Sequence, residues 1–351
     1  MPDAKTRLRR ALARQELDRP PCVCPGGMMN MVTRELMERA GLSWPRGHTD
    51  PVHMARLARA AWDAGCFENA GLPFCMTVEA EAFGAGVDLG DMTGEPRVAR
   101  YAIDSLEAWD SLPPCDAGAG RMGVVAEAVS LLGEKGGEVP VIGNLTGPMS
   151  LAGSLLEPVA LYKGLRRRPD QARAFLEMLA DAILAFGLRL LAAGADVIAL
   201  SDPSGTGEIL GPKLFAAYEV PLCNRILGGL RAAYPGAGLI VHICGKMHTV
   251  FAQLAGIQAD AVSFDAVVSL KKARAHLPGT ALMGNVSTFA LETGSPAKVA
   301  ALTRHCLASG ADIVSPACGM GNASPLANIQ AMLRTVRDPG AGGNHARHPL
   351  A

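Results

Sequence analysis

The sequence predicts an α/β protein that folds as a (β/α)8 barrel, the TIM barrel, with an N-terminal helical extension. Short apolar segments alternate with longer helical patterns from about residue 120 onward, which is typical of parallel βα units. The tripeptide "GAD" occurs at 194–196 and 310–312, where a helix-ending glycine leads into a strand. A doubly wound open sheet is the alternative fold, but no GxGxxG motif follows any predicted strand.

Eight segments are predicted to form the barrel strands, and most of them end in polar or glycine-rich sequence. In chain order they are 21–27, 73–84, 139–148, 195–205, 238–245, 259–265, 281–287 and 311–319. Between them we predict helices, including 170–193 and 297–308, where apolar residues recur at helical spacing. Residues 1–337 are expected to form one barrel domain with an N-terminal helix at 1–20. The Gly/Pro-rich tail at 338–351 is expected to be disordered.

The composition excludes several classes of function. Lys and Arg together number 33, Asp and Glu together also number 33, and aromatic residues make up 5% of the chain. A neutral chain without a basic stripe is not expected to bind nucleic acid or a membrane surface. The longest apolar stretch, 182–200, contains Arg189 and Asp196, and the N-terminus has no apolar signal region, so we expect a cytoplasmic protein. The nine cysteines are an odd number, which does not indicate a disulfide framework.

A candidate metal site lies at the carboxyl ends of two predicted strands. In "VHICG" (241–245), His242 and Cys244 are two residues apart, so in a strand their side chains point to the same side. Cys318 ends the last predicted strand, and the carboxyl ends of barrel strands meet at one face. One imidazole and two thiolates around Zn²⁺ leave a fourth position open, which is the pattern of catalytic zinc sites.

The residues alone leave other interpretations of these positions open. A His-x-Cys pair at a strand end also occurs as two buried polar side chains without a metal. Cys22 and Cys24 have the same spacing but no nearby histidine, which favours packing. His248 is expected within the helix that follows Cys244, as a surface residue rather than a ligand. The remaining cysteines are expected to fill the core.

Several longer stretches carry a resemblance to a known family. They include "ELMERAGLSWPRGHTDPVHMARLA", "LPFCMTVEAEAFGAGVDLG", "GNLTGPMSLAG", "LSDPSGTGEILGP", "VHICG" and "SPACG". Over about residues 20–335 the chain resembles the uroporphyrinogen decarboxylase superfamily, and within it the methylcobamide:coenzyme M methyltransferase branch. The resemblance implies a barrel in which His242, Cys244 and Cys318 hold catalytic zinc. It also implies that an acidic residue after the next strand can occupy the fourth zinc position, where this chain has Asp265.

The reaction implied by the resemblance moves a methyl group from a methylated corrinoid (a methylcobamide) to a small thiol such as coenzyme M. Zinc ionises the bound thiol, which attacks the methyl group on Co(III), and cobalt leaves as Co(I). The chain contains no DxHxxG cobalamin-binding motif, so we expect a separate protein to carry the corrinoid. We expect the enzyme to be a monomer or a homodimer.

Other candidate site residues lie near the ends of predicted strands. Glu79 and Glu81, near the end of the second predicted strand, either transfer protons or cap a helix. The Met-rich sequence after the first strand suits a corrinoid face but also suits ordinary packing. The candidate cofactor-binding residues are Met28, Met29, Asn144, Asp202 and Asn285.

Three other functions stay open at this point. The same chemistry could serve another acceptor, such as homocysteine. Decarboxylation of a porphyrinogen calls for arginines in the loop after the first strand, where "CPGGMMNM" contains none. The third alternative is a non-catalytic barrel that binds zinc or a corrinoid.

Overall fold

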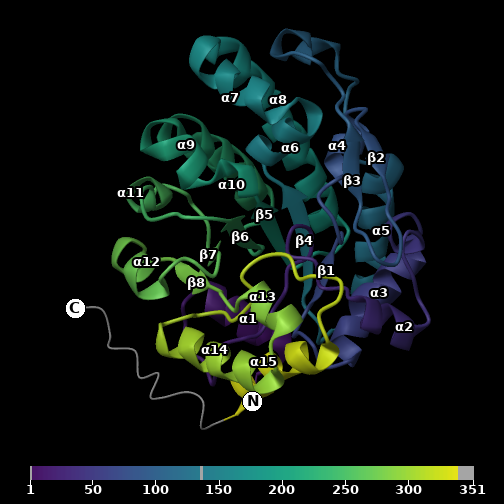
Figure 1. The fold of residues 1–351 in the computed structure, drawn as a ribbon, viewed down its shortest axis with the longest axis vertical. Coiled ribbons are helices and arrows are strands. Elements are labelled where there is room, and N and C mark those ends of the chain that lie inside the picture. The colour runs from purple at the N-terminus through teal and green to yellow at the C-terminus, as the bar shows by residue number, and fades with distance from the viewer. Residues whose placement is uncertain (1, 135–136, 339–351) are drawn as a thin grey trace.

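The computed structural model describes residues 2–134 and 137–338, and a parallel sheet lies at its centre with helices around it (Figure 1). The six strands of this sheet are adjacent in the order β1-β4-β5-β6-β7-β8, and all neighbouring strands are parallel. Their bounds are Ala70–Leu72 (β1), Val141–Thr146 (β4), Val197–Ser201 (β5), Gly238–Ile243 (β6), Ala261–Phe264 (β7) and Ala281–Met283 (β8). A separate antiparallel hairpin is formed by Gly86–Asp88 (β2) and Arg97–Arg100 (β3).

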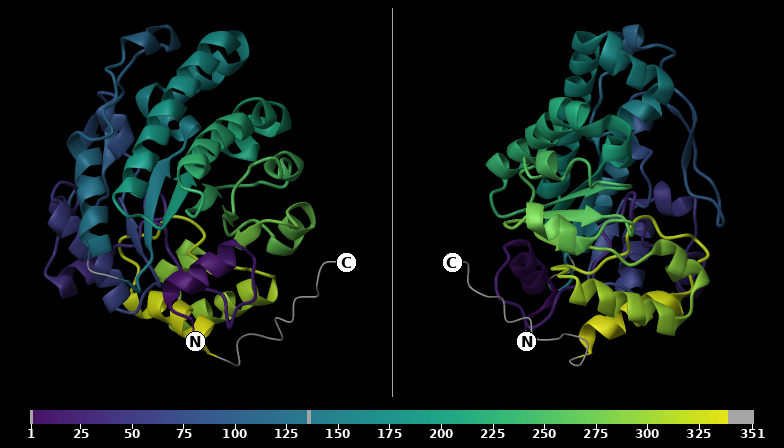
Figure 2. Two further views of the ribbon diagram at one scale, coloured as in Figure 1. Left: turned by 180° about the vertical axis from the view of Figure 1, so that it is seen from behind. Right: turned by 60° about the vertical axis from the view of Figure 1, so that its left-hand side comes forward.

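Helices connect the strands and lie outside them (Figures 1 and 2). The α-helices before β5 are Ala4–Leu12 (α1), Arg34–Ala40 (α2), Pro51–Asp63 (α3), Val78–Ala82 (α4), Gly120–Glu134 (α5), Pro148–Leu155 (α6), Pro158–Arg167 (α7) and Pro169–Ala192 (α8). Those after it are Gly207–Leu214 (α9), Val220–Ala233 (α10), Phe251–Leu254 (α11), Leu270–His276 (α12), Thr288–Thr293 (α13), Pro296–Ala308 (α14) and Leu326–Arg337 (α15). Short 3-10 helices span Arg46–His48 (η1), Leu106–Ser111 (η2) and Pro203–Gly205 (η3), and Phe215–Glu219 (η4) is π-helical.

Two further extended segments continue the sheet from β8 back to β1. Met283 at the end of β8 forms a parallel bridge with Ile313, and Val314 forms a parallel bridge with Cys22. The carbonyl of Cys22 then accepts a hydrogen bond from the Glu68 N–H, two residues before β1. These bonds connect the two edges of the six-stranded sheet, as the predicted (β/α)8 barrel requires. Prolines in both segments, including Pro21 and Pro316, lack the N–H donors of a longer strand ladder.

The structure confirms most of the predicted strands and corrects one. Strands β4 to β8 lie within the segments predicted for them, and all of their residues except Gly238 are buried, as expected for parallel strands covered by helices. The prediction of a strand at 73–84 is wrong, because the strand is β1, which ends at Leu72. Pro73 follows it directly, and the good helix formers of 78–82 form α4.

The predicted helices at 170–193 and 297–308 correspond to α8 and α14. Gly194 and Gly310, which follow them in the two "GAD" sequences, have φ values of 108° and 88°, a left-handed conformation that glycine adopts without a steric penalty. The N-terminal helix α1 is shorter than the predicted 1–20. It buries Leu8 and Leu12 at the end of the barrel where β6 begins, and Figure 2 shows it there in dark purple.

The described part of the chain contains no helix that is both long and apolar enough to cross a bilayer. The predicted disordered tail falls, apart from Asp338, on residues 339–351, which lie outside the described residues.

Candidate metal centre

His242 stands near the carboxyl end of β6, and the register of the neighbouring strands fixes its surroundings. It is paired with Ser201 of β5 on one side and with Ser263 of β7 on the other. The side chain is fully buried, and its Nδ1 lies 3.0 Å from Ser263 Oγ. With Nδ1 held by this hydroxyl, Nε2 is the nitrogen that remains for a ligand.

Cys244 and Cys318 bring two sulfur atoms to His242. The Nε2 of His242 lies 2.9 Å from Cys244 Sγ, which in turn lies 2.9 Å from Cys318 Sγ. Of all His, Cys, Asp and Glu residues in the described chain, these three form the one group whose ligand atoms lie within 4.8 Å of one another. Both cysteines are half-buried, whereas His242 is buried. The arrangement therefore has a closed side at the imidazole and an accessible side at the sulfurs.

The sulfur atoms of Cys244 and Cys318 are hydrogen-bonded to each other, and either can be the donor. The hydrogen bond between them lowers the pKa of Cys318, and together with burial it raises the pKa of Cys244 well above its usual range. The nearby carboxylate of Asp265 adds to the rise at Cys244. Three ligand atoms this close form a site that a cation of suitable preference can occupy.

Asp265 lies beside this group but is not one of the three residues that define it. Its Oδ2 accepts a hydrogen bond of 3.3 Å from the Gly245 N–H, and its Oδ1 accepts one of 3.1 Å from the Val267 N–H. Asn285 donates to the backbone carbonyls of Asp265 and Val268, which holds the loop after β7 in place. Asp265 is therefore anchored to the backbone of Gly245, the residue that follows Cys244. Its role as a metal ligand remains a prediction.

The competing ligands lie in different surroundings. Cys22 and Cys24 are fully buried, and burial raises the pKa of both thiols far above the usual range. The Cys24 thiol donates to the backbone carbonyl of Met29 over 2.8 Å, so this sulfur has a partner within the fold. His248 lies in an exposed turn before α11, so the expectation that it sits inside a helix is wrong.

The candidate corrinoid-facing residues have different degrees of access. Met28 lines a cavity described below, whereas Met29 is fully buried, with its sulfur 3.7 Å from Ser263 Oγ. Asn144 donates to Ser201 Oγ over 3.1 Å. Asp202 accepts hydrogen bonds from Met149 N–H, Ser150 N–H and Ser150 Oγ, so it caps the first turn of α6. Burial raises the pKa of Asp202 to about 6.

Glu79 and Glu81 both belong to α4 but contact different partners. Glu79 is buried and accepts hydrogen bonds from the backbone N–H and the hydroxyl of Thr146, at the end of β4. Burial raises the pKa of Glu79. Glu81 pairs with the buried guanidinium of Arg121 at 3.2 Å. Each carboxylate thus links α4 to another element, and their roles in proton transfer remain predictions.

A cavity of about 470 Å³ lies at the same carboxyl face of the barrel as the three ligand residues. Its walls come from loops that follow the carboxyl ends of the extended segments, including Gly27 and Met28, residues 75–77, and Gly319, which directly follows Cys318. Glu95, from the segment before β3, also lines it. The described carboxyl face of the barrel thus combines the three ligand residues with space for a small molecule.

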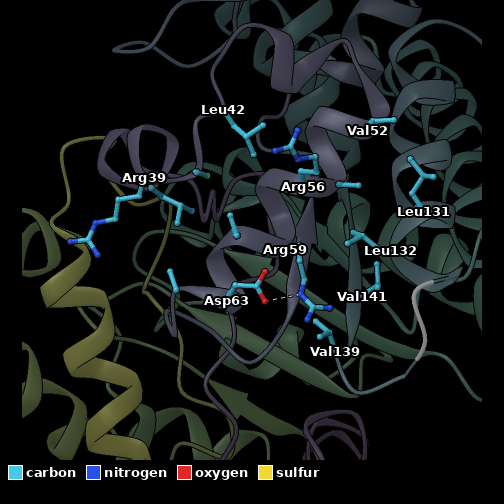
Figure 3. Close-up of a pocket in the computed structure, with 15 residues that line it drawn as sticks. Arg39, Leu42, Val52, Arg56, Arg59, Asp63, Leu131, Leu132, Val139 and Val141 are labelled. Atoms are coloured by element: carbon cyan, nitrogen blue, oxygen red, sulfur yellow. Dashed lines mark hydrogen bonds and ion pairs between the residues drawn. The ribbon is translucent and has the colours of Figure 1, made fainter.

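A second cavity of about 470 Å³ lies on the outside of the barrel, between α2, α3 and α5 (Figure 3). Its floor is apolar, and Arg59 pairs with Asp63 at its rim. Val139 and Val141 place it at the amino end of β4, whereas the ligand group lies at the carboxyl ends of the strands. It is therefore separate from the candidate metal centre.

Two residues with a place in this site were not singled out from the sequence. Ser263 could have been found from register, because it occupies the position of β7 that pairs with His242. Glu95 lies outside any strand end, in a segment of irregular sequence, and only the folded chain brings it to the cavity beside Gly319.

The uroporphyrinogen decarboxylase family model matches residues 3–339. The chain belongs to this family. Among curated members, methylcobamide:CoM methyltransferase MtbA of Methanosarcina mazei is 33% identical over 95% of this chain and 97% of the relative. MtaA of Methanosarcina barkeri, another methylcobamide:CoM methyltransferase, is 30% identical over 94% and 96%. A solved structure of a methyltransferase from Methanosarcina mazei superposes with a TM-score of 0.88 at 29% identity and covers 95% of this chain and 98% of that one.

Proposed function

We propose that this chain is a corrinoid:thiol methyltransferase, which moves a methyl group from a methylated corrinoid on a partner protein to a small thiol. The observation that carries the proposal is the convergence of His242 Nε2, Cys244 Sγ and Cys318 Sγ beside a cavity at the carboxyl face of the barrel. The relatives named for methyl transfer from a methylcobamide to coenzyme M support the same chemistry. We propose residues 1–337 as the single barrel domain that performs it.

Zinc is the metal that fits this site best. One imidazole and two thiols are a donor set that suits zinc, and three protein ligands leave one position for a substrate. His242 already has the partner at Nδ1 that zinc-binding histidines usually have. When bound, zinc would lower the pKa of a coordinated acceptor thiol, so that the sulfur is ionised at neutral pH.

Four side chains are proposed to have different roles at the metal site. Cys244 and Cys318 would bind a metal as thiolates, so the thiol proton of their mutual hydrogen bond would be released on binding. Ser263 orients the imidazole of His242. Asp265, anchored on the Gly245 N–H, is proposed to adjust how readily a thiol enters the open position.

The proposed methyl transfer needs no oxidant, reductant or other reactant besides the methylated corrinoid and the thiol. A bond forms between the acceptor sulfur and the methyl carbon as the cobalt–carbon bond breaks. The electron pair of the broken bond stays on cobalt, which becomes Co(I), and the thiol proton passes to solvent. Decarboxylation of a porphyrinogen is not favoured, because no arginine or lysine is among the residues that line the cavity.

The proposal is tested with free methylcobalamin, zinc-loaded protein and a set of small thiols, while the absorbance of cobalt is followed. We expect thiol-dependent formation of Co(I) that requires zinc and is lost in His242→Ala. A folded, zinc-loaded protein that forms no Co(I) with any thiol would instead support the non-catalytic alternative. A porphyrinogen tested in parallel should not be decarboxylated.

A further inference from the structure

The cavity beside Cys318 has an unusual charge for a site that would bind an anionic thiol. Glu95 is the only Asp, Glu, Lys or Arg among the residues that line it, and the others are mostly glycine, methionine and small polar residues. An incoming sulfonate or carboxylate would therefore meet negative charge.

Arg121 and Lys246, two cations that follow parts of the site in the fold or the chain, are paired with other groups. Arg121 lies behind the cavity wall, where it donates to Cys75 Sγ at 2.9 Å, to Thr77 Oγ1 at 3.1 Å and to Glu81 at 3.2 Å. It is buried and is not among the residues that line this cavity. Lys246, which follows the His-x-Cys pair, extends toward Glu208, with its Nζ 3.9 Å from the carboxylate.

Glu95 is held in a fixed position with one oxygen left for a ligand. The Nδ2 of Asn30 donates to Glu95 Oε1 over 2.9 Å, and Asn30 is itself fully buried and bonded to the backbone carbonyl of Val32. The second oxygen, Oε2, has no hydrogen-bond partner among the described residues. Glu95 is exposed to solvent in the open cavity, so a small molecule can reach it.

We propose that the acceptor is an aminothiol, a small thiol that carries an ammonium group, and that Glu95 determines this specificity by pairing with the ammonium. The inference rests on the proposed methyl transfer and names the class of its acceptor. It separates this chain from the coenzyme M named for its relatives, since that thiol carries a sulfonate instead of a cation. Glu95 acts on substrate choice and takes no part in breaking or forming bonds.

Three thiols with the same two-carbon chain test the proposal: 2-aminoethanethiol, 2-mercaptoethanol and 2-mercaptoethanesulfonate. The kcat/KM of methylcobalamin demethylation is measured for each with the wild type, with Glu95→Gln and with Glu38→Gln, the same change on an exposed helix outside the cavity. We expect Glu95→Gln to lower the value for the aminothiol about tenfold, as a charged hydrogen bond in a partly desolvated site is lost. The neutral thiol should be unaffected, and Glu38→Gln should match the wild type. Because each comparison uses one thiol, differences in intrinsic reactivity cancel.

Binding of the S-methyl products by calorimetry separates this proposal from the methyl transfer itself, because it needs no turnover. The methylated aminothiol should bind the wild type about tenfold more tightly than Glu95→Gln, while the methylated sulfonate should bind the variant at least as well as the wild type. Equal affinity of wild type and variant for the amine product, or a preference of the wild type for the sulfonate product, would overturn the role of Glu95. Failure to form Co(I) with any thiol would overturn the methyl transfer while leaving this binding result to stand or fall separately.

Discussion

Cys22-x-Cys24 and His242-x-Cys244 have the same spacing, and both stand in extended segments of the central barrel. Their surroundings differ. Cys22 and Cys24 are fully buried, and the Cys24 thiol is bonded to the Met29 carbonyl, whereas Cys244 is half-exposed and lies 2.9 Å from a third ligand, Cys318. Two ligands at alternate strand positions therefore do not suffice for a metal centre. A third ligand and an accessible side decide between a core cysteine and a candidate ligand.

The largest expected effect separates these two pairs by metal content. Cys318→Ala should reduce zinc from about one ion per chain to nearly none, because two protein ligands remain of the three. Cys24→Ala should keep the metal, since its sulfur is not part of the ligand group. The measurement is metal analysis of both variants after dialysis against a weak chelator. If Cys24→Ala loses zinc and Cys318→Ala retains it, the assignment of the two pairs must be exchanged.

An intermediate effect is expected from the residue that supports His242. Ser263→Ala removes the partner of Nδ1, so the imidazole is less well oriented, and zinc affinity should fall by about 10- to 100-fold while the protein stays folded. Competition with a chromogenic chelator gives the affinity, and circular dichroism gives the folded state. Ser315→Ala provides a control, because Ser315 is also a buried serine but bonds to the carbonyl of Pro316. Equal zinc affinity in the two serine variants would leave Ser263 with a packing role.

The smallest expected effect on the metal is that of Asp265→Asn. The three-ligand site should retain about one zinc per chain, because Asp265 is outside the ligand group. The affinity for the acceptor thiol should change by a few-fold to about tenfold, since a negative charge next to the open position is removed. Thiol titrations of the zinc-loaded variant check this. Unchanged thiol affinity between pH 6 and 9 would restrict Asp265 to its backbone contacts with Gly245 and Val267.

The sequence was most informative where local pattern and topology agree. Parallel strands covered on both faces are continuous apolar runs, so β4, β5 and β6 could be located from their residues, and the ends of those strands located His242. The first part of the chain was less predictable. There, β1 has only three residues before Pro73, and the segment around Cys22 pairs through isolated bridges, so neither has the length of an ordinary strand signal.

The residues of the site could be predicted where barrel topology determines their position, and not where strand register or an irregular segment does. His242, Cys244 and Cys318 follow strand ends, so barrel topology brings them to one face, and the structure places them together. The sequence of a single strand does not determine its register with the neighbouring strand. For this reason the pairing of Ser263 with His242 was not predicted. Glu95 reaches the cavity through the path of an irregular segment, for which sequence periodicity gives no signal.

The central claim is that the three-ligand group holds a metal with one position open to an acceptor thiol. Proton release on addition of thiol to zinc-loaded protein, measured in weakly buffered solution near neutral pH, tests it most directly, because a thiol that binds the metal must give up its proton. We predict about one proton per chain for the wild type and none for Cys318→Ala or for metal-free protein. Thiol binding by the zinc-loaded wild type without proton release would contradict the claim.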